Sequence, residues 1–91
     1  MKDVNEFVDS LHYGYELVFT YHGQEFFIQG WNENNKHSLI LDRWEPPSDG
    51  YIWISSEREG NEFPVEEFLN AKLWDGRTFW EAEAEMEWTG G

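Results

Sequence analysis

The chain of 91 residues contains no cysteine, and this absence excludes several classes of protein. Disulfide scaffolds, thiolate nucleophiles and zinc sites built on cysteine are all ruled out. No apolar run approaches the roughly 18 residues that a membrane-spanning helix needs. The opening residues 1–6 lack the apolar segment and cleavage pattern of a secretory signal. We therefore expect a cytoplasmic protein that does not bind membranes.

Basic residues are also scarce, with six Lys and Arg against nineteen Asp and Glu, for a formal net charge of −13. A surface of this charge repels nucleic-acid phosphates and anionic lipid headgroups, so neither is an expected partner. It attracts a basic protein by long-range steering that weakens with salt. The alternative explanation for the acidity is solubility alone.

Motifs for catalysis are missing as well. The chain has no glycine-rich phosphate loop and no Gly-x-Ser-x-Gly nucleophile motif. The three histidines, His12, His22 and His37, are not spaced as metal ligands, and we expect each to be an exposed turn residue. Carboxylates are abundant, but nothing singles out a pair for hydrolysis or for a metal. We therefore predict no enzyme activity, no cofactor and no metal.

Aromatic residues, in contrast, are plentiful: six Trp, seven Phe and four Tyr make up 19% of the chain. Disordered chains of similar charge lack such residues, so we expect a folded protein. A chain of this length has room for one hydrophobic core, and residues 1–91 are predicted to form a single domain.

Residues 15–31 predict a β-hairpin with His22-Gly23 as its two-residue loop. This register pairs Tyr21 with Gln24 and, at the other end, Tyr15 with Gly30. A slip of one residue would turn the apolar row toward solvent, so the pattern also predicts the register. One face of the hairpin then carries Tyr15, Leu17, Phe19, Phe26 and Ile28, and the other carries Glu16, Val18, Thr20, Glu25, Phe27 and Gln29.

Other elements surround this hairpin. Residues 3–12 have the apolar spacing of a short helix, with Asp3 and Glu6 placed as a capping box. A turn at 32–36 precedes strands at 38–44 and 51–55. The prolines in the 45–50 loop cannot continue a strand ladder, and residues 56–62 are polar and expected to be mobile.

The C-terminal third predicts helices. Pro64 suits the first turn of a short helix, Asp75-Gly76 forms a turn, and Thr78 with Glu81 forms a capping box. Residues 79–88 alternate with period two like a strand, but Ala, Glu and Met favour a helix, which we predict. The expected fold class is α+β. It comprises a four-stranded antiparallel meander with an N-terminal helix and two C-terminal helices, all packed on one face of the sheet.

The tryptophans provide the best candidate site, because six are too many for one small core. Trp53 alternates with Ile52 and Ile54, so either Trp53 or the two isoleucines face the helices. If the isoleucines face inward, Trp53 joins Val18, Phe27 and Trp31 on the open side of the sheet. The alternative is that the C-terminal helix covers this side. The predicted binding residues are Trp31, Trp53 and Phe27, with Glu16, Glu25 and Glu33 as an acidic rim.

The helix start Val4-Asn5-Glu6-Phe7, the hairpin centre at 19–28 and the ending at 66–71 with Asp75-Gly76-Arg77 resemble short uncharacterised α+β proteins of Gram-positive bacteria. The resemblance covers most of the chain, and its motifs are structural: a hairpin turn, a helix stripe and a capped turn. It implies a compact bacterial α+β domain and carries over no functional residues.

Two functions remain open from the sequence. The first is a non-catalytic protein-binding domain, similar to an inhibitor, an immunity protein or an adaptor, that docks on a basic protein. The second is a small-molecule or glycan binding module that uses exposed tryptophans as stacking platforms. Self-association into a homodimer is compatible with either, and the sequence does not rank monomer against dimer.

Overall fold

The predicted hairpin lies at the centre of the computed structural model, which describes residues 3–44, 51–60 and 62–90. Strand β1 (Leu17–Tyr21) pairs antiparallel with β2 (Gln24–Glu33), from Leu17 opposite Ile28 to Tyr21 opposite Gln24. His22 and Gly23 have φ angles of 49° and 80°, as the tight mirror-image hairpin turns require. The predicted register is therefore confirmed over β1.

The open end of the hairpin differs from the prediction. The Gly30 N–H donates to the Gly14 carbonyl at 3.0 Å, and Tyr15 is 59% exposed and stacks on Tyr13 instead of entering the core. The ring of Phe63 takes the inner position. A Cβ built on Gly30 would lie 2.4 Å from that ring. A residue distant in the sequence thus displaces the Tyr15–Gly30 pair.

Two further strands complete the meander. Strand β3 (Lys36–Arg43) pairs with β2, and the turn between them is only Asn34-Asn35, with φ angles of 53° and 62°. Strand β4 (Trp53–Ile54) pairs with β3 and is shorter than the predicted strand at 51–55. The predicted loop at 45–50 lies outside the described residues.

The structure adds two strands that were not predicted. Strand β5 (Arg58–Glu59) pairs with Lys36 and His37 of β3, so part of the segment expected to be mobile is in the sheet. Strand β6 (Met86–Gly90) pairs with β1 at the opposite edge, which gives the order β4-β3-β2-β1-β6. The helix predicted at 79–88 is therefore wrong in its second half, where the chain forms a strand.

This second half changes conformation after one helical turn. Helix α3 (Phe79–Ala82) runs into a 3₁₀ turn, η1 (Glu83–Glu85), and then into β6. The free edge of β1 supplies backbone hydrogen-bond partners that a helix would not use, and Met86 becomes buried. Tertiary pairing here outweighs the helix propensity of Ala, Glu and Met.

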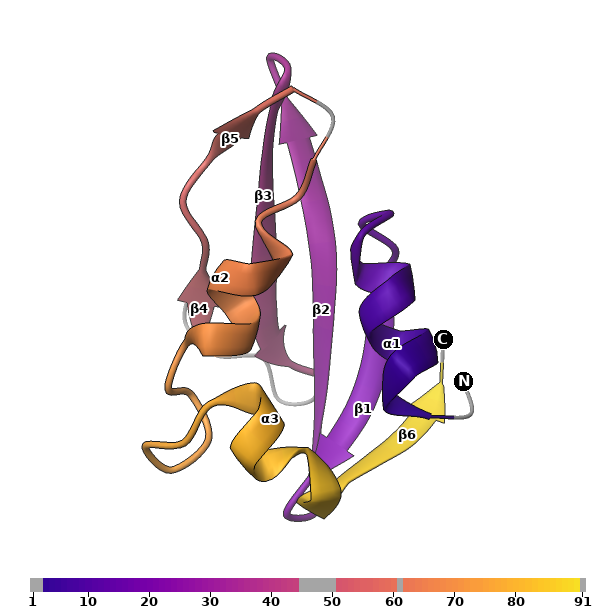
Figure 1. The fold of residues 1–91 in the computed structure, drawn as a ribbon. Coiled ribbons are helices and arrows are strands. Elements are labelled where there is room, and N and C mark those ends of the chain that lie inside the picture. Colours follow the sequence, from indigo (N-terminus) through magenta and orange to yellow (C-terminus); the bar gives the residue numbers. More distant parts are fainter. Residues whose placement is uncertain (1–2, 45–50, 61, 91) are drawn as a thin grey trace.

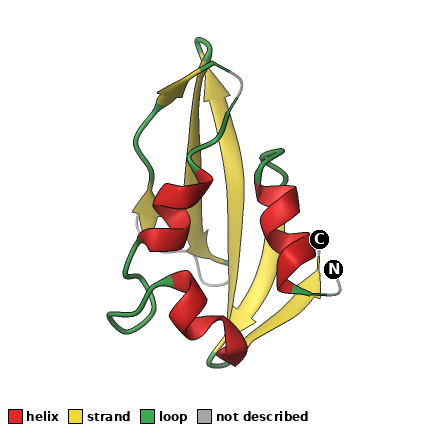
Figure 2. Cartoon of the chain, viewed as in Figure 1, coloured by secondary structure: helices red, strands yellow, loops and turns green. Residues whose placement is uncertain are grey.

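Helix α1 (Val4–Leu11) begins at Asp3, whose carboxylate accepts a hydrogen bond from the Glu6 N–H at 2.9 Å. Helix α2 (Val65–Asn70) follows Pro64, and the predicted Thr78–Glu81 capping box opens α3. Figures 1 and 2 show α1, α2 and α3 on the same side of the sheet. The α+β fold class with an antiparallel sheet and helices at both ends is thus confirmed.

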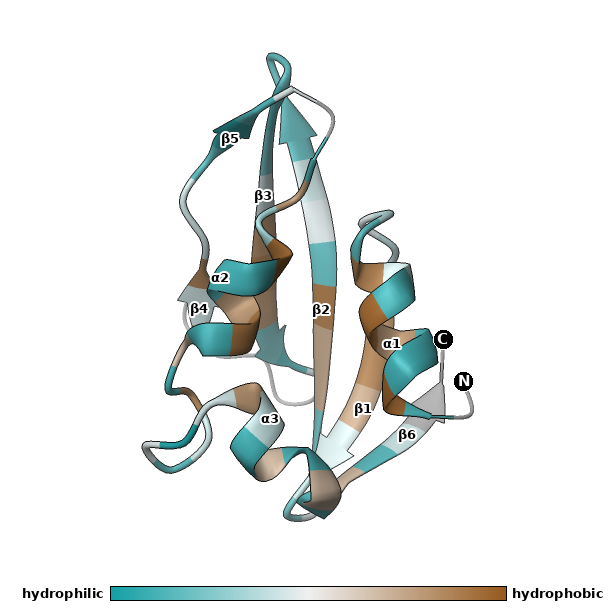
Figure 3. Ribbon diagram, in the orientation of Figure 1, coloured by the Kyte–Doolittle hydropathy of each residue, from teal (hydrophilic) through white to brown (hydrophobic). Residues whose placement is uncertain are grey.

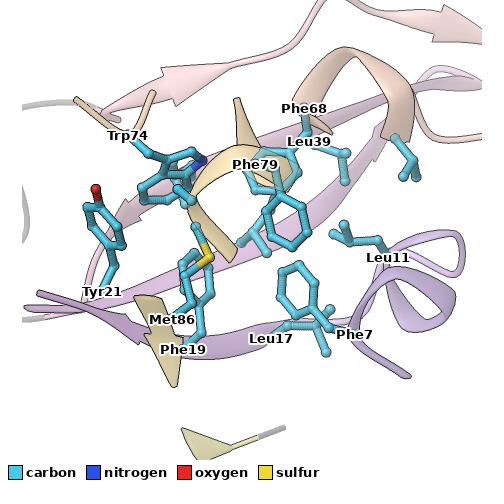
Figure 4. Close-up of a cluster of buried hydrophobic side chains, with 14 residues drawn as sticks. Phe7, Leu11, Leu17, Phe19, Tyr21, Leu39, Phe68, Trp74, Phe79 and Met86 are labelled. Carbon is cyan, nitrogen blue, oxygen red and sulfur yellow. The ribbon is translucent and has the colours of Figure 1, made fainter. Parts of the chain in front are cut away.

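The hydrophobic core lies between these helices and the sheet (Figure 4). Phe7 of α1 stacks on Phe79 of α3, with ring centroids 5.5 Å apart, and meets Phe19 of β1 edge to face at 5.4 Å. Phe68 of α2 and Trp74 close the other side. Figure 3 shows hydrophobic residues on β1, α1 and the middle of β2, and hydrophilic ones where β2 turns into β3. Within the described ranges, no helix combines the length and apolar character needed to cross a bilayer.

Candidate functional site

The strand register assigns each residue of the sheet to one of its two faces. Residues directly opposite in neighbouring strands share a face. Leu17, Ile28, Leu41 and Trp53 form one such row on the side of the helices, the covered face. The other side is called the open face here. Its strand residues include Val18, Thr20, Glu25, Phe27, Gln29, Trp31, Ser38, Ile40, Asp42 and Ile54.

Large apolar side chains lie exposed on the open face. Trp31 is 51% exposed and Ile54 is 55% exposed. Phe27 is half-buried and meets the ring of Trp44 edge to face at 5.7 Å, while Trp44 itself is 44% exposed. Ser38, Ile40 and Asp42, which are the open-face residues of β3 between Phe27 and Ile54, are buried. The apolar strip that the helices leave uncovered therefore consists of Phe27 and Trp31 on β2, together with Trp44 and Ile54, and it flanks these buried residues.

Carboxylates border the strip. Glu25 and Glu33 lie at the two ends of β2, Glu87 of β6 lies opposite Thr20, and Glu59 of β5 lies opposite Lys36; all four acids are exposed. Trp31 Nε1 donates to Glu33 Oε2 at 3.4 Å. Lys36 lies opposite both Glu33 and Glu59, so two acids flank this basic residue. The border of the open face is thus mainly acidic along the described strands.

The structure brings together four of the six predicted binding residues: Trp31, Phe27, Glu25 and Glu33 all lie on β2 and its open side. Glu16 is exposed but precedes β1 and belongs to no strand. The position expected for Trp53 is wrong. It lies on the covered face, with its ring 5.7 Å from that of Phe68.

The prediction for Trp53 fails because alternation along a strand does not indicate which of the two sets of residues faces inward. The isoleucines face outward instead, and Ile54 joins the strip together with Trp44. The predicted alternative, a C-terminal helix over this face, is also excluded for α3. Phe79 of α3 stacks on Phe7 of α1 in the core beneath the covered face.

A second group of polar residues, the turn cluster, joins the hairpin tip to the C-terminal segment. It consists of Tyr21, His22, Asp75, Arg77 and Glu85. The Tyr21 hydroxyl donates to Asp75 Oδ2 at 2.9 Å and accepts from Arg77 Nη2 at 2.8 Å. Arg77 Nη1 and His22 Nε2 each contact a different oxygen of Glu85. The polar groups of this cluster thus form hydrogen bonds with one another.

Two groups of the turn cluster have shifted pKa values, those of Glu85 and Tyr21. Hydrogen bonds from Arg77 and then from His22 lower the pKa of Glu85 to about 2. Burial raises the pKa of Tyr21, and the hydrogen bond from Arg77 opposes this effect. Glu85 directly precedes β6, so the cluster holds the start of this strand beside the hairpin tip. The geometry of the turn cluster therefore indicates a structural role, which is to connect the hairpin tip to the C-terminal segment.

The three histidines differ in exposure: His12 and His22 are exposed and His37 is buried. His22 lies in the hairpin turn and is exposed, as predicted, whereas His37 is buried on β3 with its ring 4.7 Å from that of Phe63. His12 is exposed at the end of α1. Among the residues that the structure describes, no group of three or more histidines and carboxylates gathers in a way that would hold a metal ion.

A hollow of about 250 Å³ lies at the end of α1 and the start of α2, lined by His12, Glu62, Phe63 and Glu66. Ligand pockets usually enclose about 300–1,000 Å³, so this hollow is small. Arg58 Nη1 lies 2.6 Å from Glu66 Oε1 and already neutralises that carboxylate. This hollow offers less to a ligand than the open face does.

No family model, curated protein or solved structure matches the chain. The polar groups of the turn cluster are hydrogen-bonded to one another and the hollow is small, whereas the open face combines exposed apolar side chains with a mainly acidic border. The open face is the strongest candidate.

Proposed function

We propose that this chain is a non-catalytic protein-binding domain that docks on a basic protein through its open face, as small inhibitors, immunity proteins and adaptors do. The observation that carries the proposal is the uncovered apolar strip of Phe27, Trp31, Trp44 and Ile54, bordered by Glu25, Glu33, Glu59 and Glu87. Protein interfaces commonly have an apolar centre and a polar rim. Tryptophan is also among the residues most enriched at energetic hot spots.

The net charge of the domain determines which kind of partner it prefers. The net charge of −13 steers a basic partner toward the domain and repels an acidic one. Rim charges act mainly on the rate of association, while a buried aromatic anchor acts on dissociation. Trp31 and the acidic border thus have separable roles.

Trp31 and Trp80 offer a matched pair of variants for the test. They are 51% and 50% exposed, but Trp31 lies on the open face and Trp80 lies on α3. Wild type, Trp31→Lys and Trp80→Lys proteins would be immobilised and incubated with a lysate of the host cells. The captured proteins would be identified after washes at low and then high salt.

We expect a basic protein that is retained by wild type and Trp80→Lys at low salt and released at high salt. Trp31→Lys should lose it. Capture that is equal for all three proteins would contradict the proposal, because charge alone would then explain the binding. An empty wild-type sample at both salts would also count against it.

Glycan binding has one observation in its favour, since Trp31 and Trp44 are both part-exposed on this face. Stacking of a neutral sugar would depend little on salt, unlike docking of a basic protein. Titration of a panel of neutral oligosaccharides, followed by tryptophan fluorescence in wild type and Trp31→Lys, separates the two. A saturable change that Trp31→Lys abolishes and salt does not affect would support the glycan.

A further inference from the structure

The open face also constrains the shape of what covers it. Resting on the proposed function, we infer that the segment of the partner that docks here is a basic amphipathic α-helix lying along β2.

Backbone hydrogen bonding favours a helix on this face. A segment that covers the face of a sheet, rather than its edge, receives no backbone hydrogen bonds from the strands, because those groups pair within the sheet. An extended segment on that face would bury unpaired N–H and C=O groups. A helix satisfies its own backbone and presents only side chains. Helices on both faces of a sheet are also a common layer arrangement.

The length of β2 also suits a helix. Glu25 and Glu33 are eight residues apart on β2, or about 26 Å at the usual rise of a strand. A helix of about 18 residues has the same length. Phe27 and Trp31, four residues apart, are separated by about 13 Å. Apolar residues at i, i+4 and i+8 of a helix cover about 12 Å of one face.

The charges at the two ends of β2 favour a basic segment. Glu25 and Glu33 lie at the two ends of the strip, so the matching helix carries Lys or Arg near both of its ends and apolar residues between them. A second copy of this chain fits less well, because it carries the same charge of −13 and would place one acidic border on another.

The test uses synthetic peptides of about 18 residues, the length derived above from the helical rise. The patterned peptide has leucines at helical spacing on one face and lysines near both ends. The scrambled peptide has the same composition without the spacing. Both would be titrated into isotope-labelled wild type, Trp31→Lys and Trp80→Lys proteins, with affinity, amide chemical shifts and peptide helicity as readouts.

We expect the patterned peptide to become helical on binding and to shift open-face amides of β2 and β3. Its affinity for Trp31→Lys should fall by at least about tenfold, as loss of an interface hot spot does, and Trp80→Lys should bind like wild type. The scrambled peptide should bind at least about tenfold more weakly than the patterned one, because it cannot present its apolar residues together.

Other outcomes overturn the inference in distinguishable ways. If both peptides bind equally and Trp31→Lys weakens both, the open face binds basic chains but not as a helix, and only the inference fails. If neither peptide depends on Trp31, the proposed function fails with it. If sedimentation shows that wild type dimerises and Trp31→Lys does not, a second copy covers the face instead.

Charge reversal adds a control on the acidic ends. Glu25→Lys and Glu33→Lys should each weaken the patterned peptide and flatten its salt dependence. Asp9→Lys makes the same charge change at an exposed position on α1. An equal loss for Asp9→Lys would show that net charge alone is at work, and would overturn the matching of charges to the two ends of β2.

Discussion

The two faces of the sheet are built from the same strands, yet they meet different surroundings. On the covered face, Leu17, Phe19, Ile28 and Leu41 are at most 3% exposed, whereas on the open face Trp31 and Ile54 are more than half exposed. A sheet with one solvated face usually alternates apolar and polar residues. Strand β2 instead carries Phe26 and Ile28 on one face and Phe27 and Trp31 on the other. Such a two-sided apolar pattern is typical of strands with a layer on each side, which is why the open face is the proposed site.

The largest expected difference between the two faces is in stability. Phe19→Ala removes a fully buried ring that contacts Phe7, Phe26 and Trp74, and should lower the free energy of unfolding by about 3–5 kcal/mol. Urea unfolding measures this loss. Phe19→Leu keeps an apolar side chain and should lose less. A loss below about 1 kcal/mol for Phe19→Ala would contradict the assignment of this ring to the core.

A smaller loss should follow from crowding the covered face near Phe63. In Gly30→Ala the new Cβ would meet the Phe63 ring at 2.4 Å and the Gly14 Cα at 2.7 Å. Overpacking of this kind usually costs about 1–3 kcal/mol. In a Phe63→Ala background the cost should shrink but not vanish, because the backbone contact remains. Thermal unfolding of the single and double variants tests this, and equal costs in both backgrounds would contradict the contact.

The turn cluster lies at the end of the sheet and predicts a dependence on acid. The pKa of Glu85 is about 2 in the folded protein, below its ordinary value of 4.5. Its contribution to stability is therefore present above pH 4.5 and is lost as the pH falls toward 2. In Glu85→Gln this part of the acid loss should disappear, so its stability should fall less steeply than that of wild type over this range. Parallel profiles for the two proteins would contradict the role of Arg77 and His22.

The smallest expected effect is on the open face itself. Trp31→Lys and Trp80→Lys both change exposed rings, and each should alter the free energy of unfolding by no more than about 0.5 kcal/mol. Their binding behaviour should differ, as described above. A large loss of stability in Trp31→Lys alone would mean that this ring supports the fold, and the contrast between the two faces would be weaker.

Local patterns explain which predictions hold. The β1–β2 register follows from period-two alternation and the His22-Gly23 turn, both of which lie within a few residues of one another. The Asp3 cap of α1 and the Thr78–Glu81 box also depend on neighbours three residues apart. Glu25 and Phe27 fall on one face for the same reason, because they belong to the predicted hairpin. Trp31 and Glu33 share this face because β2 continues into the residues predicted as a turn and pairs there with β3.

The sequence by itself determined the α+β class, the central hairpin and its register, the helix starts and the acidic surface. Tertiary structure decided that Trp53 faces Phe68, that Phe63 replaces Tyr15 over Gly30, and that residues 86–90 extend along β1. The physical reason is the separation along the chain between the residues that interact. Turns, caps and alternation are encoded within a few residues, whereas the inward side of a short strand and the use of a free sheet edge depend on partners far away in the chain.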